Sequence, residues 1–385
     1  MKILHVYRTF FPDTQGGLEE TIRQICVNTK ALGFDSRVFT LSANPEPAVV
    51  DVDGISVHRV KESFEIASCN ISLSAFREYE KQLEWADLVN IHFPWPFADV
   101  LHLATKMRKP TVVTYHSDIV RQKVLLSLYH PLMMKFLKTV DKIVCTSPNY
   151  FATSNVLSNF QEKSEIIPIG IEESFYPTPS EAQEEAAVSR WGKDYFLFVG
   201  VFRYYKGLHL LLDAAKDAPY RVIIVGSGPI EDDLKAQAKE LELENVIFTG
   251  RVSDADKVAL FRNCRAVVFP SYLRTEAFGV TLLEGAMFSK PLISTEIGSG
   301  TSHVCIHDLN GLVVPPGQAR FLRRAMDQIY HRPDLADLMG KRSRKRYERL
   351  FTGKLMGMRY AELYTSLLDQ DARPVQAKAP SASRA

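Results

Sequence analysis

Two glutamates eight residues apart form the most informative chemical pattern in the sequence. Glu276 is expected in a loop before a helix, and Glu284 two turns into that helix. Eight helical residues rise about 12 Å. This spacing suits one carboxylate that binds a sugar and another that binds a ribose, with a diphosphate over the helix N-terminus between them. Acidic residues also complement a helix dipole, so the pair alone leaves a purely structural role open.

Two cations in the run GVFRYYKG could bind a diphosphate. Arg203 and Lys206 follow an expected strand and directly precede an expected helix. The guanidinium offers a forked set of donors and the ammonium a point charge, and both suit phosphate oxygens. Lysine and arginine are common on protein surfaces, so a solvated loop is the alternative interpretation.

Two glycines and a histidine provide a second group of candidates in the first half of the chain. Gly16 and Gly17 lie between the first strand and the first helix, where they would let a ligand approach free helix N–H groups. His116 ends a strand, where it could donate to a sugar hydroxyl or a phosphate, with Asp118 orienting it. A flexible turn and a strand-end histidine bonded to backbone are the structural alternatives.

Two D-x-D sequences could bind a metal, but their contexts favour structural roles. Asp51-Val-Asp53 precedes Gly54, which is typical of a hairpin turn, and Asp254-Ala-Asp256 follows Ser253, a typical helix N-cap. Five scattered cysteines without a C-x-x-C pair argue against structural zinc and suit a reducing compartment. We therefore expect a cytoplasmic protein without a metal site.

Strand-like runs alternate with helix-length segments along the whole chain. In the first half the expected strands are Lys2–Tyr7, Ser36–Ser42, Ile55–Val60, Ala86–His92, Pro110–His116, Asp141–Ser147 and Ile166–Ile169, and the clearest helix is Leu18–Leu32. In the second half the expected strands are Tyr195–Val199, Tyr220–Val225, Asn245–Phe248, Arg265–Pro270, Pro291–Thr295 and Gly311–Val314. The helices expected between them are Gly207–Lys216, Ile230–Leu241, Asp254–Asn263, Ala277–Phe288 and Gln318–His331. This alternation predicts an α/β protein with two Rossmann-like doubly wound domains and an interdomain cleft at the carboxyl ends of their strands.

Together these motifs resemble those of the retaining glycosyltransferases of family 4, which have the GT-B fold. The resemblance covers nearly the whole chain, from the GGLEE run to the C-terminal helix. Its most specific part is Phe269–Thr295, which matches the family's E-x7-E motif, and the second match is Val199–Ala215. The family usually has arginine at the position of Val201, whereas here Arg203 lies two residues later.

The resemblance implies roles for the candidate residues in binding a nucleotide diphosphate sugar. Lys206 would neutralise the diphosphate, Glu276 would bind the donor sugar and Glu284 the ribose. Gly16 and Gly17 would close over the diphosphate. The expected catalytic residues are His116, Lys206 and Glu276. The expected donor-binding residues are Gly16, Gly17, Arg203, Lys206, Gly250, Arg251, Val252, Glu276, Phe278, Gly279, Val280 and Glu284, of which Gly250 to Val252 would frame the base.

The resemblance also implies an order of domains. We expect an N-terminal acceptor-side domain over residues 1–177, a linker over 178–190 and a C-terminal domain that binds the nucleotide sugar over 191–350. A helix over 351–370 would return to the N-terminal domain, and 371–385 would form a disordered tail.

The expected activity is retaining, metal-independent transfer of a hexose to a glycan or polyprenyl-diphosphate-linked acceptor in bacterial surface polysaccharide synthesis. GDP-mannose is the best candidate donor, with a UDP-sugar, a dTDP-sugar or GDP-rhamnose as alternatives. The donor is a co-substrate, and no cofactor is expected. A two-domain oxidoreductase is a remote alternative, which the missing third glycine after Gly226-Ser227-Gly228 disfavours. A sugar-binding protein without catalysis is another.

The net charge and its distribution along the sequence indicate which partners the protein could bind. The net charge of +2 argues against a nucleic-acid partner bound through bulk charge. Between Ala104 and Val140, however, seven cations stand against one acid, beside the apolar run Val124–Leu137. This pattern favours a peripheral contact with an anionic membrane surface or a groove for a lipid-diphosphate acceptor. An ordinary amphipathic helix packed on its sheet is the alternative.

Overall fold

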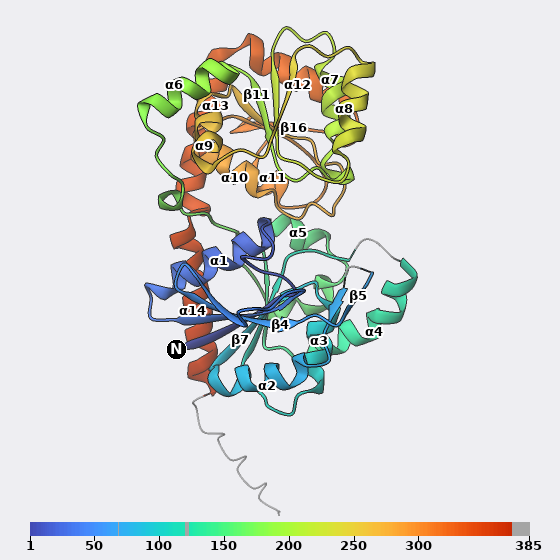
Figure 1. Ribbon diagram of the computed structural model, residues 1–385, viewed down its shortest axis with the longest axis vertical. Coiled ribbons are helices and arrows are strands. Elements are labelled where there is room, and N and C mark those ends of the chain that lie inside the picture. The colour runs from blue at the N-terminus through green and yellow to red at the C-terminus, as the bar shows by residue number, and fades with distance from the viewer. Residues whose placement is uncertain (68, 120–122, 372–385) are drawn as a thin grey trace, which may run out of the picture.

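A computed structural model describes residues 1–67, 69–119 and 123–371 of the chain. Two α/β domains follow one another along the long axis of the molecule, each with helices packed around a mainly parallel sheet (Figure 1). The expected α/β class with two doubly wound domains is therefore confirmed.

The N-terminal sheet has eight strands in the order β10-β9-β8-β7-β1-β2-β4-β3. They are β1 (Lys2–Val6), β2 (Asp35–Ser42), β3 (Val49–Val52), β4 (Ile55–Lys61), β7 (Leu88–Phe93), β8 (Thr111–Tyr115), β9 (Lys142–Cys145) and β10 (Ser164–Ile166). A separate hairpin contains β5 (Phe64–Ile66) and β6 (Cys69–Ile71). The helices are α1 (Gly17–Lys30), α2 (Ala75–Trp85), α3 (Pro96–Ala104), α4 (Lys123–Thr139) and α5 (Pro148–Thr153), and the 3-10 turns are Leu157–Lys163 and Glu173–Phe175.

The C-terminal sheet has six parallel strands in the order β13-β12-β11-β14-β15-β16. They are β11 (Phe196–Val199), β12 (Val222–Val225), β13 (Val246–Gly250), β14 (Ala266–Phe269), β15 (Leu292–Thr295) and β16 (Gly311–Val314). The helices are α6 (Glu181–Trp191), α7 (Leu208–Ala215), α8 (Glu231–Glu240), α9 (Asp254–Asn263), α10 (Val280–Met287), α11 (Thr301–Val304), α12 (Ala319–His331), α13 (Pro333–Leu350) and α14 (Gly353–Asp371), and a 3-10 turn covers Tyr204–Lys206.

Strand order reverses between β1 and β7 in the first sheet and between β11 and β14 in the second. In doubly wound sheets the loops beyond the strand ends at such a reversal form the ligand site. The candidate residues of both halves lie in or near these loops.

Three strands were not expected from the sequence. Strand β3 is a half-exposed edge strand that pairs antiparallel with β4 across the Asp53-Gly54 turn, and the β5–β6 hairpin lies outside the main sheets. Such short edge elements lack the long apolar runs that mark buried parallel strands. The segment expected as a linker contains α6, which begins with a capping box between Ser180 and Gln183 and buries Trp191 in the C-terminal core.

The chain passes twice between the domains, and the two passages lie side by side. Ile171 and Thr352 form a parallel bridge, and a Cβ on Gly170 would lie 2.2 Å from the Thr352 carbonyl oxygen. Only glycine fits this close approach.

Beyond the second passage, α14 packs on the N-terminal domain alongside α1 (Figure 1). The Tyr364 hydroxyl accepts a hydrogen bond from Asn90, and the Tyr360 hydroxyl bonds Thr114. These buried contacts fix the helix to strands β7 and β8. Of the expected tail, Asp371 ends α14, and residues 372–385 lie outside the described residues.

Candidate active site

The site is built on two loops that leave neighbouring strands, β11 and β14. Gly207 ends the first loop with φ +70°, and a Cβ there would lie 2.2 Å from the Pro270 carbonyl oxygen in the second. Close by, the Tyr272 N–H donates to the Tyr205 carbonyl oxygen at 3.0 Å. The two loops are therefore in direct main-chain contact, and each fixes the position of the other.

This contact brings together Lys206 and Glu276, which lie 70 residues apart in the sequence and form an ion pair. Only 14% of the Lys206 side chain and 11% of the Glu276 side chain are exposed. The Lys206 ammonium lies 4.6 Å from the centre of the Phe269 ring, and Ser271 donates to Glu276 at 3.4 Å. Because neither charge could be desolvated alone at acceptable cost, each depends on the other.

The N-terminus of α10 begins four residues after Glu276 and has a geometry that could bind an anion. Gly279 stands at the N-cap with φ +88°, and no side chain of the described residues caps the helix. Uncapped N–H groups at a helix start attract phosphate. Thr281 donates to the Val199 carbonyl oxygen at 3.0 Å, which holds the first turn of α10 against the end of β11.

The glycine loop of the N-terminal domain lies against this helix start. A Cβ on Gly17 would lie 3.7 Å from a Val280 methyl carbon, so the two domains meet here. Helix α1 also begins without a side-chain cap, with Gly16 at its N-cap. The sequence-predicted glycines and Val280 are thus brought together, with two helix N-termini beside them.

Glu284 is buried within α10, and its carboxylate contacts two residues that sequence reasoning missed. The Tyr176 hydroxyl donates to Oε1 at 3.0 Å, and the Lys257 ammonium lies 3.3 Å from the same oxygen. The nearby carboxylate raises the pKa of Lys257, and burial, followed by that carboxylate, raises the pKa of Tyr176 well above its usual value. No motif marks either residue, because Tyr176 comes from the domain junction and Lys257 from α9.

The remaining residues expected to bind the donor lie partly at strand ends, partly at the surface and partly in the core. Gly250 ends β13 with φ +69°, and the Arg251 guanidinium donates to Ser227 at 3.0 Å, next to the end of β12. Arg203 is exposed at the start of its 3-10 turn, whereas Val252 packs partly against the core. The Phe278 ring is 3% exposed and packs against Phe351, so any donor contact of this residue would come from its main chain.

His116 ends a chain of three buried, stacked histidines. The His5 Nδ1 lies 3.1 Å from His92 Nε2, and His92 Nδ1 lies 3.0 Å from His116 Nε2. Burial lowers the pKa of His5 and of His116 to about 3, and that of His92 falls well below its ordinary value. All three rings are therefore neutral at ordinary pH, so each has one N–H that can donate and one nitrogen that can accept.

The ring of His5, at the far end of the three histidines, decides in which direction their hydrogen bonds are donated. His5 Nε2 is buried and has no hydrogen-bond partner among the described residues. A buried N–H without a partner is rarer than an unpaired acceptor, so we assign the protons of His5 and His92 to Nδ1. His116 then accepts at Nε2 and carries its own proton on Nδ1, as a donor.

The orienting role expected for Asp118 was wrong. His92, not Asp118, is hydrogen-bonded to His116, and the Asp118 carboxylate instead accepts from Tyr115, Ser154 and Arg274. Both D-x-D sequences have the expected local structure. Asp51 accepts from the Gly54 N–H in the β3–β4 turn, and Ser253 caps α9 by accepting from the Asp256 N–H.

Comparison with known proteins identifies the family. Residues 15–175 match the family model described as Glycosyltransferase Family 4, and residues 180–346 match that described as Glycosyl transferases group 1. The chain is 51% identical to the D-rhamnosyltransferase WbpZ of Pseudomonas aeruginosa, over 91% of this chain and 92% of that protein. It is 46% identical to the O-antigen chain mannosyltransferase C of Escherichia coli, over 96% and 99% of the two chains.

The chain belongs to glycosyltransferase family 4. Solved structures agree on the fold. A sucrose-phosphate synthase from Thermosynechococcus elongatus superposes with a TM-score of 0.77 at 20% identity, covering 96% of this chain and 99% of that one. Anabaena HepE in complex with UDP-glucose gives 0.77 at 18% identity, covering 95% and 100%. The molecule is therefore a glycosyltransferase with the GT-B fold.

The histidine chain of this glycosyltransferase predicts a loss of stability on acidification. In the unfolded chain each histidine binds a proton below about pH 6.5, whereas buried His5 and His116 do so only near pH 3. Between these values the unfolded state binds more protons, so the free energy of unfolding rises with pH. Each histidine contributes up to about 1.4 kcal/mol per pH unit. Urea unfolding should therefore show falling stability from pH 7 to pH 5.

The matched variant is His116→Asn, which keeps a hydrogen-bonding side chain but cannot titrate. Its stability should fall less steeply with decreasing pH than that of the wild type. Equal slopes in the two proteins would show that His116 does not remain neutral in the folded state.

Proposed function

We propose that this glycosyltransferase transfers a hexose of the manno configuration, with retention and without a metal, from GDP-mannose to a lipid-linked glycan. Of the two relatives described above, one is named as a D-rhamnosyltransferase and the other as an O-antigen chain mannosyltransferase. D-Rhamnose is 6-deoxymannose, so both names specify sugars of one configuration. GDP-rhamnose is accordingly the second candidate donor.

The Lys206–Glu276 ion pair is the observation that carries the proposal. A nucleotide diphosphate sugar has an anion and a row of hydroxyl groups, which are the complements of an ammonium and a carboxylate. A donor would therefore draw Lys206 to its diphosphate and give Glu276 new hydrogen bonds from the sugar. The pair lies beside the uncapped N-terminus of α10, which suits the same diphosphate.

Glu284 is proposed to bind the ribose. Its contacts with Tyr176 and Lys257 both end on Oε1, so Oε2 is the oxygen that would accept from a ribose hydroxyl. The Gly250–Val252 turn, at the end of the edge strand β13, would frame the base. His116 would donate from Nδ1 to the donor sugar, because its Nε2 already bonds His92.

Stabilisation of the leaving diphosphate is proposed to come from the chain's own charges. Lys206 supplies one full charge, and the N-termini of α1 and α10 supply partial positive charge from both domains. The carboxylates of the two D-x-D sequences are engaged in turn and helix-cap interactions elsewhere.

We further propose that the acceptor side faces an anionic membrane surface at the cytoplasmic face. Helix α4 buries Met133, Phe136 and Leu137 and exposes the opposite face. That exposed face carries Val124 and Leu128, 77% and 76% exposed, followed at helical spacing by the exposed cations Lys135 and Lys138. Arg121 and the side chain of Lys123, expected in the same basic stretch, lie outside the described residues.

A second element with exposed apolar side chains belongs to the same domain. Helix α3 contacts both α4 and strand β6, and the adjoining hairpin and turn expose Phe64, Ile66 and Leu73. In the described residues, no helix has both the length and the apolar composition to span a bilayer. Exposed apolar side chains with cations on one helix face are typical of contact with lipid headgroups.

The donor is tested by incubating the protein with GDP-mannose, GDP-rhamnose, UDP-glucose and a dTDP-sugar and following nucleotide release and transfer to a polyprenyl-diphosphate-linked glycan. GDP-mannose should be turned over fastest, and EDTA should not slow the reaction. If EDTA stopped transfer and Mn²⁺ or Mg²⁺ restored it, the metal-free mechanism would be wrong. Preference for a UDP- or dTDP-sugar would overturn the donor assignment.

Replacing Glu276 by alanine should nearly abolish transfer and, because Lys206 loses its buried partner, lower the stability without unfolding the protein. Loss of one positioned polar group in a site of this kind costs ~10²–10³ in rate. The control is Glu184→Ala, which removes an ion pair with Arg262 within the C-terminal domain and should leave turnover unchanged. If Glu276→Ala retained more than a third of wild-type turnover, Glu276 would not belong to the site.

The membrane face is tested by co-sedimentation with anionic liposomes at low and high salt. Lys135→Glu with Lys138→Glu should weaken binding, since each cation near such a surface contributes about 1 kcal/mol. Val124→Ser with Leu128→Ser should weaken it independently of salt. The control reverses exposed Lys235 and Lys239 of α8 in the other domain. Binding that is indifferent to salt and to both α4 variants would make this face an ordinary solvated surface.

A further inference from the structure

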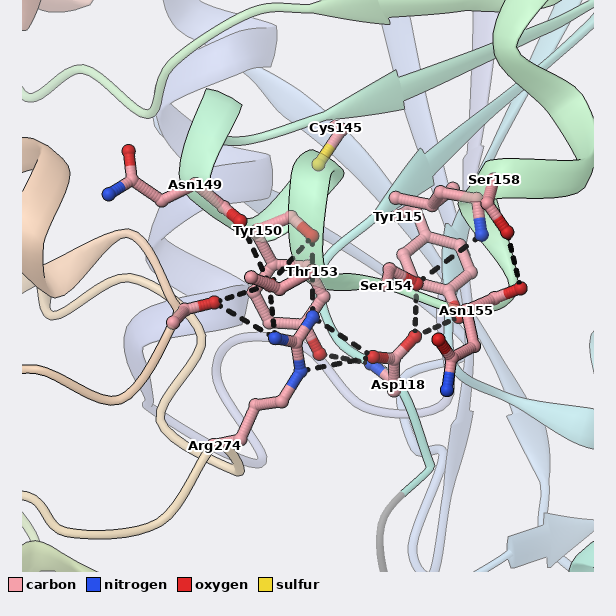
Figure 2. A network of polar contacts seen from close by, with 12 residues as sticks. Tyr115, Asp118, Cys145, Asn149, Tyr150, Thr153, Ser154, Asn155, Ser158 and Arg274 are labelled. Atoms are coloured by element: carbon pink, nitrogen blue, oxygen red, sulfur yellow. Dashed lines mark hydrogen bonds and ion pairs between the residues drawn. The ribbon is translucent and has the colours of Figure 1, made fainter.

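Arg274 extends from the C-terminal domain into a cluster of polar groups of the N-terminal domain (Figure 2). Its Nε and Nη2 both lie 3.2 Å from Asp118 Oδ2, and its Nη2 also donates to the Tyr150 carbonyl oxygen at 3.3 Å. The guanidinium carbon lies 4.2 Å from the centre of the Tyr150 ring. Its Nη1 bonds Thr153 and the Gly298 carbonyl oxygen.

The polar groups that receive Arg274 are themselves joined by hydrogen bonds. Tyr115 and Ser154 donate to Asp118 Oδ1 at 2.8 and 2.7 Å, which leaves Oδ2 directed at the guanidinium, as Figure 2 shows. The Tyr150 hydroxyl accepts from the Asp118 N–H at 2.6 Å. Asp118 is thus held in place by its own domain before any contact with Arg274.

The two partners stand next to the proposed catalytic residues on both sides of the domain interface. Arg274 lies two residues before Glu276, and Asp118 lies two residues after His116. Between Arg274 and the α10 helix start, Ala277 packs on the hydrophobic core of the N-terminal domain. The ion pair therefore connects the loop of the donor carboxylate to the loop of the histidine.

We infer that Arg274 and Asp118 are positioning residues that clamp the Glu276 loop against the His116 loop and so set the geometry for transfer. The inference rests on the proposed roles of Glu276 and His116. An isolated exposed ion pair contributes little. This one is different, because its side chains are only 22% and 19% exposed and the guanidinium has several directed acceptors.

Two further polar contacts join the domains around the clamp. Thr153 donates to the Gly298 carbonyl oxygen at 2.6 Å, and Asn149 donates to Ser302 at 3.0 Å. Both come from α5 or its end and reach the loop and helix after β15. Arg274 lies between these elements and bonds both Thr153 and Gly298, so its removal should loosen this part of the interface.

The test is a double-mutant cycle with Arg274→Gln and Asp118→Asn, measured as kcat of transfer beside the affinity for GDP. Small misplacement of reacting groups can cost up to ~10²-fold in rate. We expect each single variant to lose at least about 10-fold in kcat. The double variant should be no worse than the poorer single variant. GDP affinity should stay within about twofold of wild type, since Lys206 and α10 are untouched. Arg274→Lys should restore part of the loss.

Arg262→Gln is the control, because it breaks an ion pair within the C-terminal domain only. Small-angle scattering adds a readout that does not depend on the donor, and Arg274→Gln but not Arg262→Gln should increase the radius of gyration. The clamp would be overturned if the kcat losses of the two single variants multiplied in the double variant. It would also be overturned if GDP affinity fell as strongly as kcat. If the wild type transferred no sugar from the donor panel, the proposed function would fail. The clamp would then be tested by scattering alone, and an unchanged radius of gyration in Arg274→Gln would overturn it.

Discussion

No side chain fits between the turn at Gly207 and the carbonyl oxygen of Pro270, and the geometry of the proposed donor site depends on this contact. The left-handed conformation of Gly207 lets the loop after β11 lie directly on the loop after β14. Lys206 and Glu276 are the neighbours that result, one from each loop. The same arrangement ties the first turn of α10 to β11 through Thr281, so charge, carboxylate and helix start are fixed together.

Close contacts at the domain junction also constrain the N-terminal half of the site, which contains His116. Two chain passages lie side by side at Gly170 and Thr352, and α14 then fastens the C-terminus to the strands of the N-terminal sheet. Through Asn90 and Thr114, the tyrosines of α14 join a row of buried polar groups on β7 and β8. Strand β7 carries His92, and His116 directly follows β8. The C-terminal segment thereby contributes to the support of a candidate residue far from it in sequence.

The sequence predicted the two domains and their parallel strands, because apolar runs and capping signals report directly on buried strands and helices, but it missed the short edge strands and helix α6. It also marked residues grouped in local motifs, such as Gly16 with Gly17 and Glu276 with Gly279. It could not reveal contacts made only when separate elements meet. Lys257 beside Glu284 and His92 beside His116 depend on helix packing and strand register, and no spacing rule encodes either. Asp118 shows the reverse error. Its proximity to His116 in the sequence suggested that the two side chains interact, but strand register places His92 beside His116 instead.

The Lys206–Glu276 pair also bears on how a nucleotide sugar would enter such a site. A lone buried lysine would attract a diphosphate strongly but would be costly to desolvate during folding, and a lone buried glutamate would repel the same anion. Pairing removes both problems, because the desolvated charges compensate each other in the folded protein. A donor that supplies both a diphosphate and sugar hydroxyls can replace both halves of the pair at once. A free nucleotide can replace only one half and leaves Glu276 without its partner. If Lys206 and Glu276 bind the donor as proposed, the pair favours the intact donor over the released nucleotide, which is the preference a transferase needs to clear its product and bind the next donor.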